Sequence, residues 1–145
     1  MEQNQNQKLK AFTVLLRASQ SVQEASKKDH SKHGLNPTEF AVLELLYHKG
    51  DQPIQVIGKK ILIASSSITY VVDKLEEKGF VVRKACPSDR RVTYAAITDE
   101  GKKIMDQIFP GHIEIIEEIF NAITEDEVDI LIDLLKKVGY NAKNL

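Results

Sequence analysis

The stretch that decides the fold runs from residue 65 to residue 97 and reads SSSITYVVDKLEEKGFVVRKACPSDRRVTYAAI. Apolar residues at helical spacing after three serines predict an amphipathic helix that ends at Gly79. Two β-rich runs follow, FVVRKA and RVTYAAI, and a proline-containing loop with Asp89, Arg90 and Arg91 joins them. Helix, strand, basic loop and strand is the order of a winged helix-turn-helix, a unit that presents a helix to the major groove of DNA and a loop to the flanking backbone.

The predicted helix has an apolar face and a polar face. At about 100° per residue, one side gathers Ile68, Val71, Val72 and Leu75. The other side and its edge are polar and carry Ser66, Ser67, Thr69, Tyr70, Asp73, Lys74 and Glu77. Small hydroxyl side chains approach base edges closely, and the free amides of the first turn, which starts at Ser65, point at any nearby phosphate. Serines also cap helices without any ligand, which is enough to explain Ser65 as an N-cap; the whole set, together with the loop, favours DNA reading.

The loop places two adjacent arginines at the tip of a hairpin. Arg90 and Arg91 repel each other there and gain nothing for folding, whereas the negative potential of a narrow minor groove gives them a partner. Asp89 can hold one guanidinium by a bidentate contact, which lowers the entropy cost of inserting it. The alternative is an ordinary solvated charged turn.

Three helices are predicted before this stretch. The first covers about residues 7–32, and its broad apolar face suits either burial in its own domain or packing half against a partner chain. Residues 36–39, NPTE, suit the start of the second helix, with asparagine as N-cap and glutamate reaching back to a free amide. Residues 50–53 are a turn by composition, and a short helix at 54–60 lies only about three residues before Ser65, which is helix-turn-helix spacing.

Two helices are predicted after the wing. Thr98 caps a long helix that reaches about residue 122, and Pro110-Gly111 should kink it or end one segment. Residues 124–127 repeat the capping-box pattern, and Gly139 should stop the last helix. Chain-terminal helices this apolar indicate an inter-subunit bundle of the kind found in obligate homodimers.

Bulk properties fit one globular domain, residues 1–145. No apolar run approaches the roughly 20 residues that span a bilayer, and residues 1–10 lack the hydrophobic core of a secretory signal. The single cysteine, Cys86, excludes an intramolecular disulfide and suits a reducing cytosol, so we expect a cytoplasmic protein.

The net charge of −1 hides an uneven distribution. Residues 54–97 carry eight basic and four acidic side chains, whereas residues 98–145 carry five basic and eleven acidic ones. A positive middle in a near-neutral chain is what a protein needs if one face meets phosphates. Chance fluctuation of surface charge is the alternative.

These motifs resemble those of the MarR family of bacterial transcriptional regulators. The resemblance follows the order of elements over nearly the whole chain and rests on TEFAVLELL, SITYVVDKLEEKGFVVR, DRR and ITDEGKKI, at residues 38–46, 67–83, 89–91 and 97–104. It implies a mainly α fold with a small β-hairpin wing, in which residues 36–97 bind DNA and residues 7–33 and 98–139 form dimerisation helices. It also implies a homodimer on an inverted-repeat operator, usually a repressor without a cofactor, that a small phenolic or aromatic compound or an oxidant releases.

The resemblance also assigns roles to positions. Ser66, Ser67, Thr69, Tyr70 and Lys74 would face the major groove or its phosphates. Arg91 would enter the minor groove, with Asp89 holding it and Arg90 on the backbone. The family's ligand site lies between the dimerisation helices and the winged part, so the candidate lining residues are Phe12, Leu16, Phe40 and Tyr47, although core packing explains these equally well.

Cys86 departs from the family's peroxide sensors, whose reactive cysteine lies near the start of the first helix. The sequence is most similar to the quinone- and hydroquinone-responsive repressors of Firmicutes, which makes Cys86 a candidate electrophile sensor. Its neighbours Arg83 and Lys84 would lower the thiol pKa and favour the thiolate. An inert structural cysteine is the alternative.

Other classes of function find less support. The chain has no Gly-rich phosphate loop after a strand, no HExxH and no paired cysteines, so we expect no enzyme. His30 and His33 stand three residues apart, and His48 and His112 remain, which leaves zinc sensing as a weak alternative and no assigned metal site. A winged helix that binds proteins and not specific DNA is the other alternative.

Overall fold

A computed structural model describes residues 2–61 and 65–145 of the chain. The fold is mainly α with a small antiparallel sheet, which confirms the predicted class. In chain order the elements are α1 (Glu2–His30), the 3-10 helix η1 (Ser31–His33), α2 (Pro37–Lys49), β1 (Gln52–Pro53), α3 (Ile54–Lys60), α4 (Ser65–Glu77), β2 (Val81–Ala85), β3 (Thr93–Ile97), α5 (Asp99–Phe120) and α6 (Glu125–Lys143).

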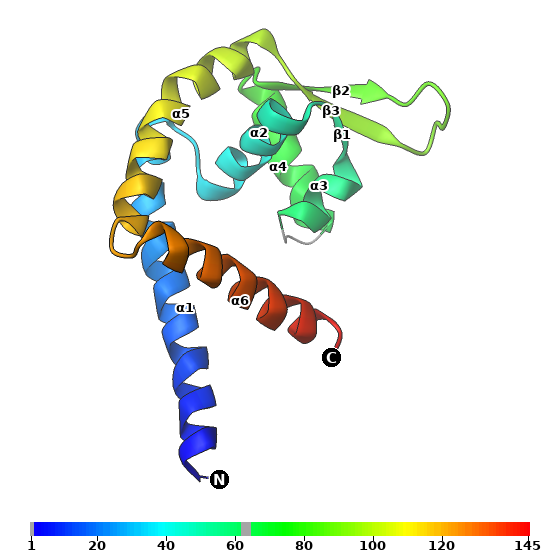
Figure 1. Ribbon diagram of the computed structural model, residues 1–145. Helices are drawn as coiled ribbons and strands as arrows, with labels where there is room; N and C mark the ends of the chain where they lie inside the picture. Colours follow the sequence, from blue (N-terminus) through cyan, green and yellow to red (C-terminus); the bar gives the residue numbers. More distant parts are fainter. Residues whose placement is uncertain (1, 62–64) are drawn as a thin grey trace.

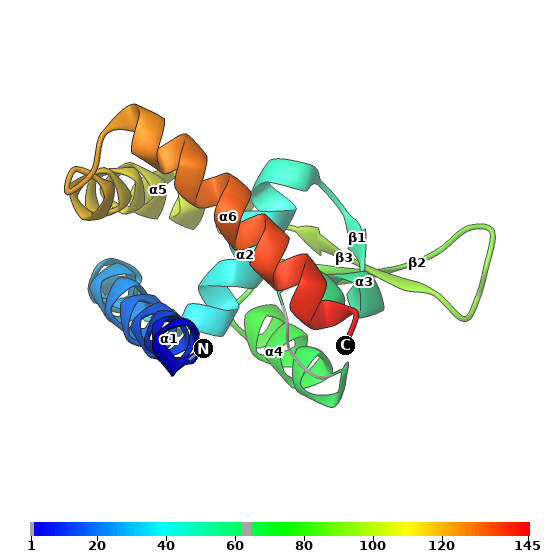
Figure 2. The ribbon, with the colours of Figure 1, turned by 60° about the horizontal axis from the view of Figure 1, so that its bottom comes forward.

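The elements form a winged part and a helical stem (Figure 1). The winged part holds α2, α3, α4 and the sheet, and the β2–β3 hairpin projects from it as the wing. The stem consists of α1 and α5, which lie side by side on the side of the molecule opposite the wing (Figure 2). Helix α6 leaves the end of α5 at an angle to the stem and runs beneath the winged part in the view of Figure 1, and none of its residues is buried.

The hydrophobic core lies inside the winged part and reaches the first half of α5. All four apolar residues predicted for one face of α4 are buried, with exposed fractions of 1% for Ile68, 8% for Val71 and 0% for Val72 and Leu75. Burial of such side chains stabilises the fold by about 1.5–3 kcal/mol each. Packing therefore fixes which face of α4 remains for solvent or DNA.

Local capping begins α2 and α5 as predicted. The Asn36 side chain accepts a hydrogen bond from the Glu39 backbone N–H at 2.8 Å, and the Glu39 carboxylate accepts one from the Asn36 N–H at 3.0 Å. Thr98 caps α5 by accepting from the Gly101 N–H at 3.0 Å. Gly34 ends η1 with a φ of 77°, a left-handed conformation that glycine adopts without strain.

Residues 50–53 are not only a turn, because Gln52 and Pro53 form the short strand β1. Gln52 pairs with Ala95 and Pro53 with Tyr94, which gives the strand order β1-β3-β2. Proline lacks a ladder donor and is confined to sheet edges, and β1 is such an edge. The composition of the segment indicated a turn because the pairing partner lies more than 40 residues away in the chain.

The helix ends predicted at Pro110 and Gly139 do not occur, whereas the alternative predicted at Pro110, a kink within one helix, agrees with the curved course of α5 (Figure 1). Helix α5 passes through Pro110 as one curved helix, so the proline removes one backbone hydrogen bond without ending a segment (Figure 1). Helix α6 passes through Gly139 and continues to Lys143, because a helical glycine costs only about 1 kcal/mol relative to alanine. Helix α1 begins earlier than predicted and ends at His30, two residues sooner, where the tighter η1 takes over.

Candidate nucleic-acid interface

Helices α3 and α4 pack against each other as the two helices of a helix-turn-helix. The predicted connection at residues 62–64 lies outside the described residues. Helix α4 begins at Ser65, but the side chains of Ser65 and Ser66 also lie outside what the structure describes, so their predicted capping and groove contacts stay predictions.

The solvent side of α4 presents hydroxyl groups, an aromatic ring and a cation. Ser67 and Thr69 are exposed, and Tyr70 is 62% exposed. The Lys74 ammonium lies 5.4 Å from the centre of the Tyr70 ring, a cation–π distance, and 3.5 Å from the Glu77 carboxylate. This face carries the predicted groove-facing residues of α4 that the structure describes.

Arg83 links the wing to this helix, a role that was not predicted from the sequence. Its guanidinium donates to the Asp73 carboxylate at 2.6 Å, to Glu76 at 2.7 Å and to the Thr69 carbonyl at 3.4 Å. Its backbone N–H also donates to Glu76 at 3.2 Å. Two acids one turn apart on a helix, followed by an arginine in the next strand, were the available signal. The network fixes β2 against α4 and neutralises carboxylates near the reading face.

At the wing tip, Asp89 holds Arg91 as predicted. The two side chains form a bidentate pair, with Arg91 Nε 3.2 Å and Nη2 3.4 Å from the two carboxylate oxygens. The Arg91 backbone N–H donates to the same carboxylate at 3.0 Å. Hydrogen bonding to the Arg91 side chain and backbone holds the pKa of Asp89 below its ordinary value, so this carboxylate stays ionised to a lower pH than a free aspartate. The Arg91 side chain is 90% exposed, and Arg90 is exposed beside it.

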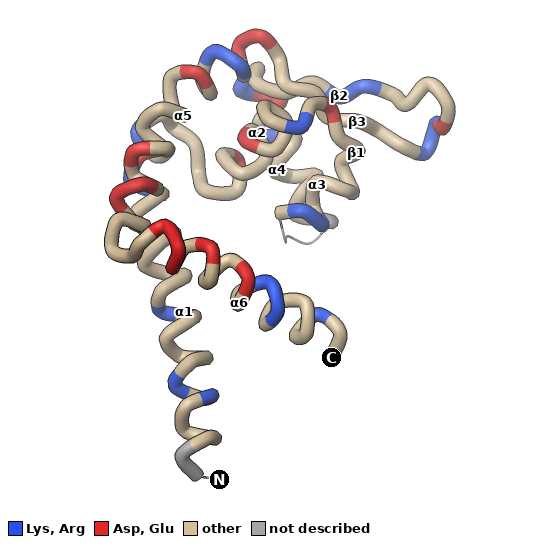
Figure 3. Tube along the Cα trace, in the orientation of Figure 1, with Lys and Arg blue, Asp and Glu red and all other residues tan. Residues whose placement is uncertain are grey.

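The wing and the reading helix border a common hollow of about 640 Å³. Thr69 from α4 lines it together with Arg83 from β2 and Asp89 and Arg91 from the loop. The structure thus brings a predicted base-reading residue and the predicted minor-groove arginine to one surface. Lys and Arg occur on the wing and in the last turn of α3, whereas Asp and Glu gather where α5 meets α6 (Figure 3).

Cys86 follows the end of β2, at the start of the wing loop, and is half-buried. Its sulfur lies 3.3 Å from the Ser88 hydroxyl, and hydrogen bonding to Ser88 lowers the pKa of the thiol. The direction of the pKa shift agrees with the prediction, but its cause was wrong. The two cations that were predicted to lower this pKa bind other groups: the Arg83 guanidinium binds carboxylates on α4, and the Lys84 ammonium lies 3.7 Å from the Asp51 carboxylate.

A second hollow, of about 840 Å³, lies between the stem and the winged part. Apolar and histidine side chains line it together with polar and charged ones, among them Glu44, Lys49 and Lys60. Phe40 from α2 lies between His30 from α1 and His112 from α5, and each imidazole centre is 4.8 Å from the Phe40 ring centre. The His112 imidazole also lies 3.6 Å from the Glu44 carboxylate. We call this hollow the stem cavity.

Only one of the four predicted ligand residues lines the stem cavity. Phe40 does so and is 4% exposed. Tyr47 instead points its hydroxyl at the Asp106 carboxylate, to which it donates a hydrogen bond. Phe12 and Leu16 are 61% and 54% exposed on α1, away from the cavity lining in a single chain. Sequence periodicity placed these residues on helices but not on a common surface.

The histidines do not assemble a metal site in the described part of the chain. Residues 2–61 and 65–145 contain no group of three His, Cys, Asp or Glu side chains that could hold a metal ion. His30 is 3% exposed, and neither of its ring nitrogens has a hydrogen-bond partner among these residues. Burial, and next the neighbouring His112, lower the pKa of His30. The described helices also include none that is long and apolar enough to cross a membrane.

Known proteins are similar to this chain in sequence and in fold. The model of the MarR family matches residues 35–93. MhqR, an HTH-type transcriptional regulator of Bacillus subtilis (strain 168), is 58% identical over 135 residues that cover 93% of each chain. Sco3205, a MarR family regulator from Streptomyces coelicolor solved in complex with DNA, superposes with a TM-score of 0.84 at 22% identity over 90% of this chain and 85% of its own. Bordetella bronchiseptica BpsR, whose DNA binding is regulated by 6-hydroxynicotinic acid, superposes with a TM-score of 0.80 at 21% identity over 90% and 98%.

Proposed function

The chain belongs to the MarR family of transcriptional regulators, and from this premise we propose that it represses transcription in the cytoplasm as a homodimer on an inverted-repeat operator, from which a small aromatic ligand releases it. It is a DNA-binding regulator and not an enzyme. The observation that carries the proposal is the single hollow bordered by Thr69 of the reading helix and Arg91 of the wing.

In the proposed complex the first turn and outer face of α4 enter the major groove. Short hydroxyl side chains meet base edges there, and Lys74 and Tyr70 meet bases or phosphates. The reading set is Ser65, Ser66, Ser67, Thr69, Tyr70 and Lys74. The wing follows the adjacent minor groove, where Asp89 aims Arg91 inward and Arg90 contacts the backbone.

The proposed dimer is supported by the exposed apolar side chains of α1 and α6. Leu9, Phe12 and Leu16 on α1 are more than half exposed, and so are Leu134 and Val138 on α6. Apolar surface of this extent marks a protein interface, and a second copy of the same helices would cover it symmetrically. Two copies also provide the two reading helices that an inverted repeat requires.

The stem cavity is the proposed effector site. It lies where the stem meets the winged part, and its lining combines the aromatic faces of Phe40 and the flanking imidazoles with polar and charged side chains. Hydroxylated aromatic compounds such as hydroquinones match this lining, and BpsR is a relative by fold whose regulator is a hydroxylated aromatic acid. Phe12 and Leu16 could join such a site only through contacts that a single chain does not make.

A thiol response at Cys86 is a second candidate for the effector step. Hydrogen bonding to Ser88 lowers the pKa of the thiol and raises its thiolate fraction, which favours attack on a quinone. Mass spectrometry after quinone exposure tests it, together with the DNA binding of a Cys86→Ser protein. An unmodified Cys86 and an unchanged response of the variant would exclude this route.

Selection of duplexes from a random pool by the purified protein tests the proposed function. We expect an enriched inverted repeat with half-sites about 10 base pairs apart centre to centre. Binding to this selected duplex should weaken steeply with salt, because phosphate contacts release counterions. A winged helix that binds only proteins would yield no enriched sequence and would bind the pool as tightly as any single duplex.

A further inference from the structure

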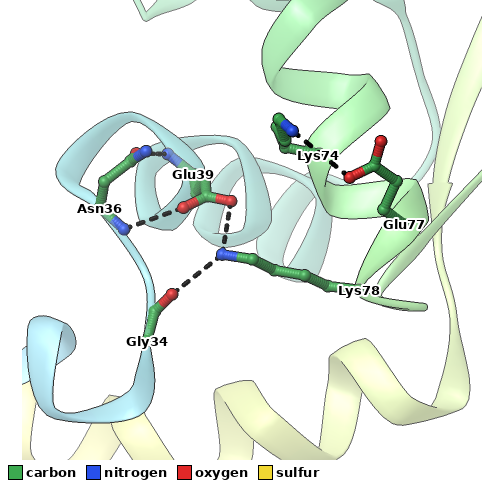
Figure 4. Close-up of polar contacts among 6 residues, drawn as sticks. All are labelled: Gly34, Asn36, Glu39, Lys74, Glu77 and Lys78. Atoms are coloured by element: carbon green, nitrogen blue, oxygen red, sulfur yellow. Dashed lines mark hydrogen bonds and ion pairs between the residues drawn. The ribbon is translucent and has the colours of Figure 1, made fainter.

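Lys78, the first residue after α4, connects three elements that lie far apart in the chain. Its ammonium donates to the Glu39 carboxylate of α2 at 2.8 Å and to the Gly34 carbonyl, which follows η1, at 2.9 Å (Figure 4). These partners precede Lys78 by 39 and 44 residues. The Lys78 side chain therefore joins the end of the reading helix to the first turn of α2 and to the loop that precedes α2.

The Glu39 carboxylate is buried and is hydrogen-bonded at both of its oxygens. Its side chain is only 5% exposed, and one carboxylate oxygen accepts from the Asn36 N–H in the capping box while the other accepts from Lys78. A buried carboxylate without a partner is strongly unfavourable, so the contact with Lys78 resists separation. A shift of the first turn of α2 is therefore transmitted to the end of α4.

The first turn of α2 is also a wall of the stem cavity. Thr38 and Phe40, on either side of Glu39 in the sequence, line the cavity, and so do Pro37 and Ala41. Glu39 is not among the lining residues and binds Lys78 instead. A molecule in the cavity would thus touch both sequence neighbours of Glu39 without touching Glu39.

We propose that the ion pair between the buried Glu39 carboxylate and Lys78 is the coupling element through which occupancy of the stem cavity changes the position of the reading helix. The proposal rests on the proposed function and adds its route of regulation. A ligand that fits the cavity better when the first turn of α2 is displaced shifts the population toward that arrangement. Lys78 follows Glu39, and α4 then leaves the orientation that suits the major groove.

Coupling of this kind is reciprocal, which allows a test without any effector. If the cavity wall biases α4, then fixing α4 on DNA must restrain the first turn of α2 by the same free energy. Hydrogen exchange at residues 37–46 reads this restraint directly. The duplex selected by the wild-type protein serves as the probe.

The variants separate coupling from charge and from folding. The double variant Glu39→Gln/Lys78→Met removes the ion pair without leaving a buried charge unpaired, and glutamine can still complete the capping box. Lys78→Arg keeps the cation and should keep the coupling. Glu77→Gln is the matched control, because Glu77 is a 67% exposed carboxylate that pairs with Lys74 within α4 and reaches no other helix (Figure 4).

In the wild type, Lys78→Arg and Glu77→Gln proteins, the duplex should slow exchange in both α4 and residues 37–46. In the double variant it should slow exchange in α4 alone. Equal protection of residues 37–46 in the double variant would overturn the proposal, and so would the absence of such protection in the wild type.

Hydroquinone provides the second arm of the test. It should weaken duplex binding by wild type about 5- to 150-fold, the usual range of allosteric coupling. The double variant should bind hydroquinone as the wild type does but release the duplex little or not at all. If hydroquinone has no effect on the wild type, the proposed effector class is wrong, and the exchange measurement still decides the role of the ion pair.

Discussion

The Arg91 side chain extends into solvent at the wing tip, and the two carboxylate oxygens of Asp89 set its direction. Replacing Arg91 by alanine should weaken binding to the selected duplex about 5- to 150-fold, because one oriented cation in a narrow groove is lost. Fluorescence anisotropy over a salt series measures both the affinity and its salt slope. Lys103→Ala, which removes an exposed cation from α5, is the control and should bind as the parent does.

Asp89→Asn tests whether orientation matters apart from charge. It removes the bidentate partner yet makes the wing more positive, so simple electrostatics predicts tighter binding and orientation predicts weaker binding. We expect weaker binding, with no further loss when Asp89→Asn is added to Arg91→Ala. Additive losses in this double-mutant cycle would show that Asp89 acts without Arg91.

The buried imidazole of His30 should make stability depend on pH. Burial and the neighbouring His112 lower the pKa of His30 in the fold, whereas Asp29 opposes the shift, so the unfolded chain binds the proton more readily. The contribution of neutral His30 to the free energy of unfolding is therefore fully present above the ordinary histidine pKa of 6.5 and is lost as the pH falls below that value. Urea unfolding on both sides of that pH measures the slope. His30→Phe should flatten it, and the exposed His33→Gln should not.

At the scale of elements, the joint between the wing and α5 depends on a glycine. A Cβ added at Gly101 would lie 2.3 Å from the Phe80 carbonyl oxygen and 2.7 Å from the Ile97 side chain. Gly101→Ala should lower the free energy of unfolding by about 1–3 kcal/mol, because the backbone must shift to admit the methyl group.

Gly139→Ala is the matched control for that joint. A Cβ at Gly139 meets nothing within 4 Å, and the residue is inside α6. Alanine there should raise the free energy of unfolding by about 0.4–1 kcal/mol, because it lowers the conformational entropy of the unfolded chain. In chemical denaturation, the changes in the free energy of unfolding of the two variants should have opposite signs if the joint at Gly101 is as tight as the structure shows. A Gly101→Ala protein as stable as the parent would contradict it.

At the scale of the whole molecule, the features that could be predicted from sequence are those with local causes. The capping residues around Asn36 and Thr98 act within four positions of themselves, and the apolar face of α4 is a periodic pattern. The strand at Gln52, the Arg83 network and the Lys78 contact depend on partners brought near by folding. Their residues looked like ordinary turn or surface residues because the sequence does not state which distant segment they meet. Exposure of Phe12 and Leu16 belongs to the same class, since it depends on what covers α1.

The exposed apolar residues of α6 predict a feature of the whole molecule, its quaternary structure. The exposed apolar residues of α6 should pack against a partner copy, so a charge placed among them should break the dimer. For Leu135→Glu we expect a sedimenting mass near 16.4 kDa, the mass of one chain, against twice that for the parent. Lys137→Ala, on the same helix, should leave the dimer intact.

The Leu135→Glu variant should also separate DNA binding by one copy from dimerisation. A monomer keeps α4, the wing and the buried core, so it should still bind one half-site. It loses the second half-site, whose binding in the dimer is an intramolecular step worth about 10²- to 10⁴-fold in affinity. Affinity for the selected duplex should therefore fall by that order, while affinity for a single half-site stays near that of the parent. Full-affinity binding of the inverted repeat by a monomeric Leu135→Glu protein would show that one copy is sufficient and that the exposed apolar residues of α6 have another purpose.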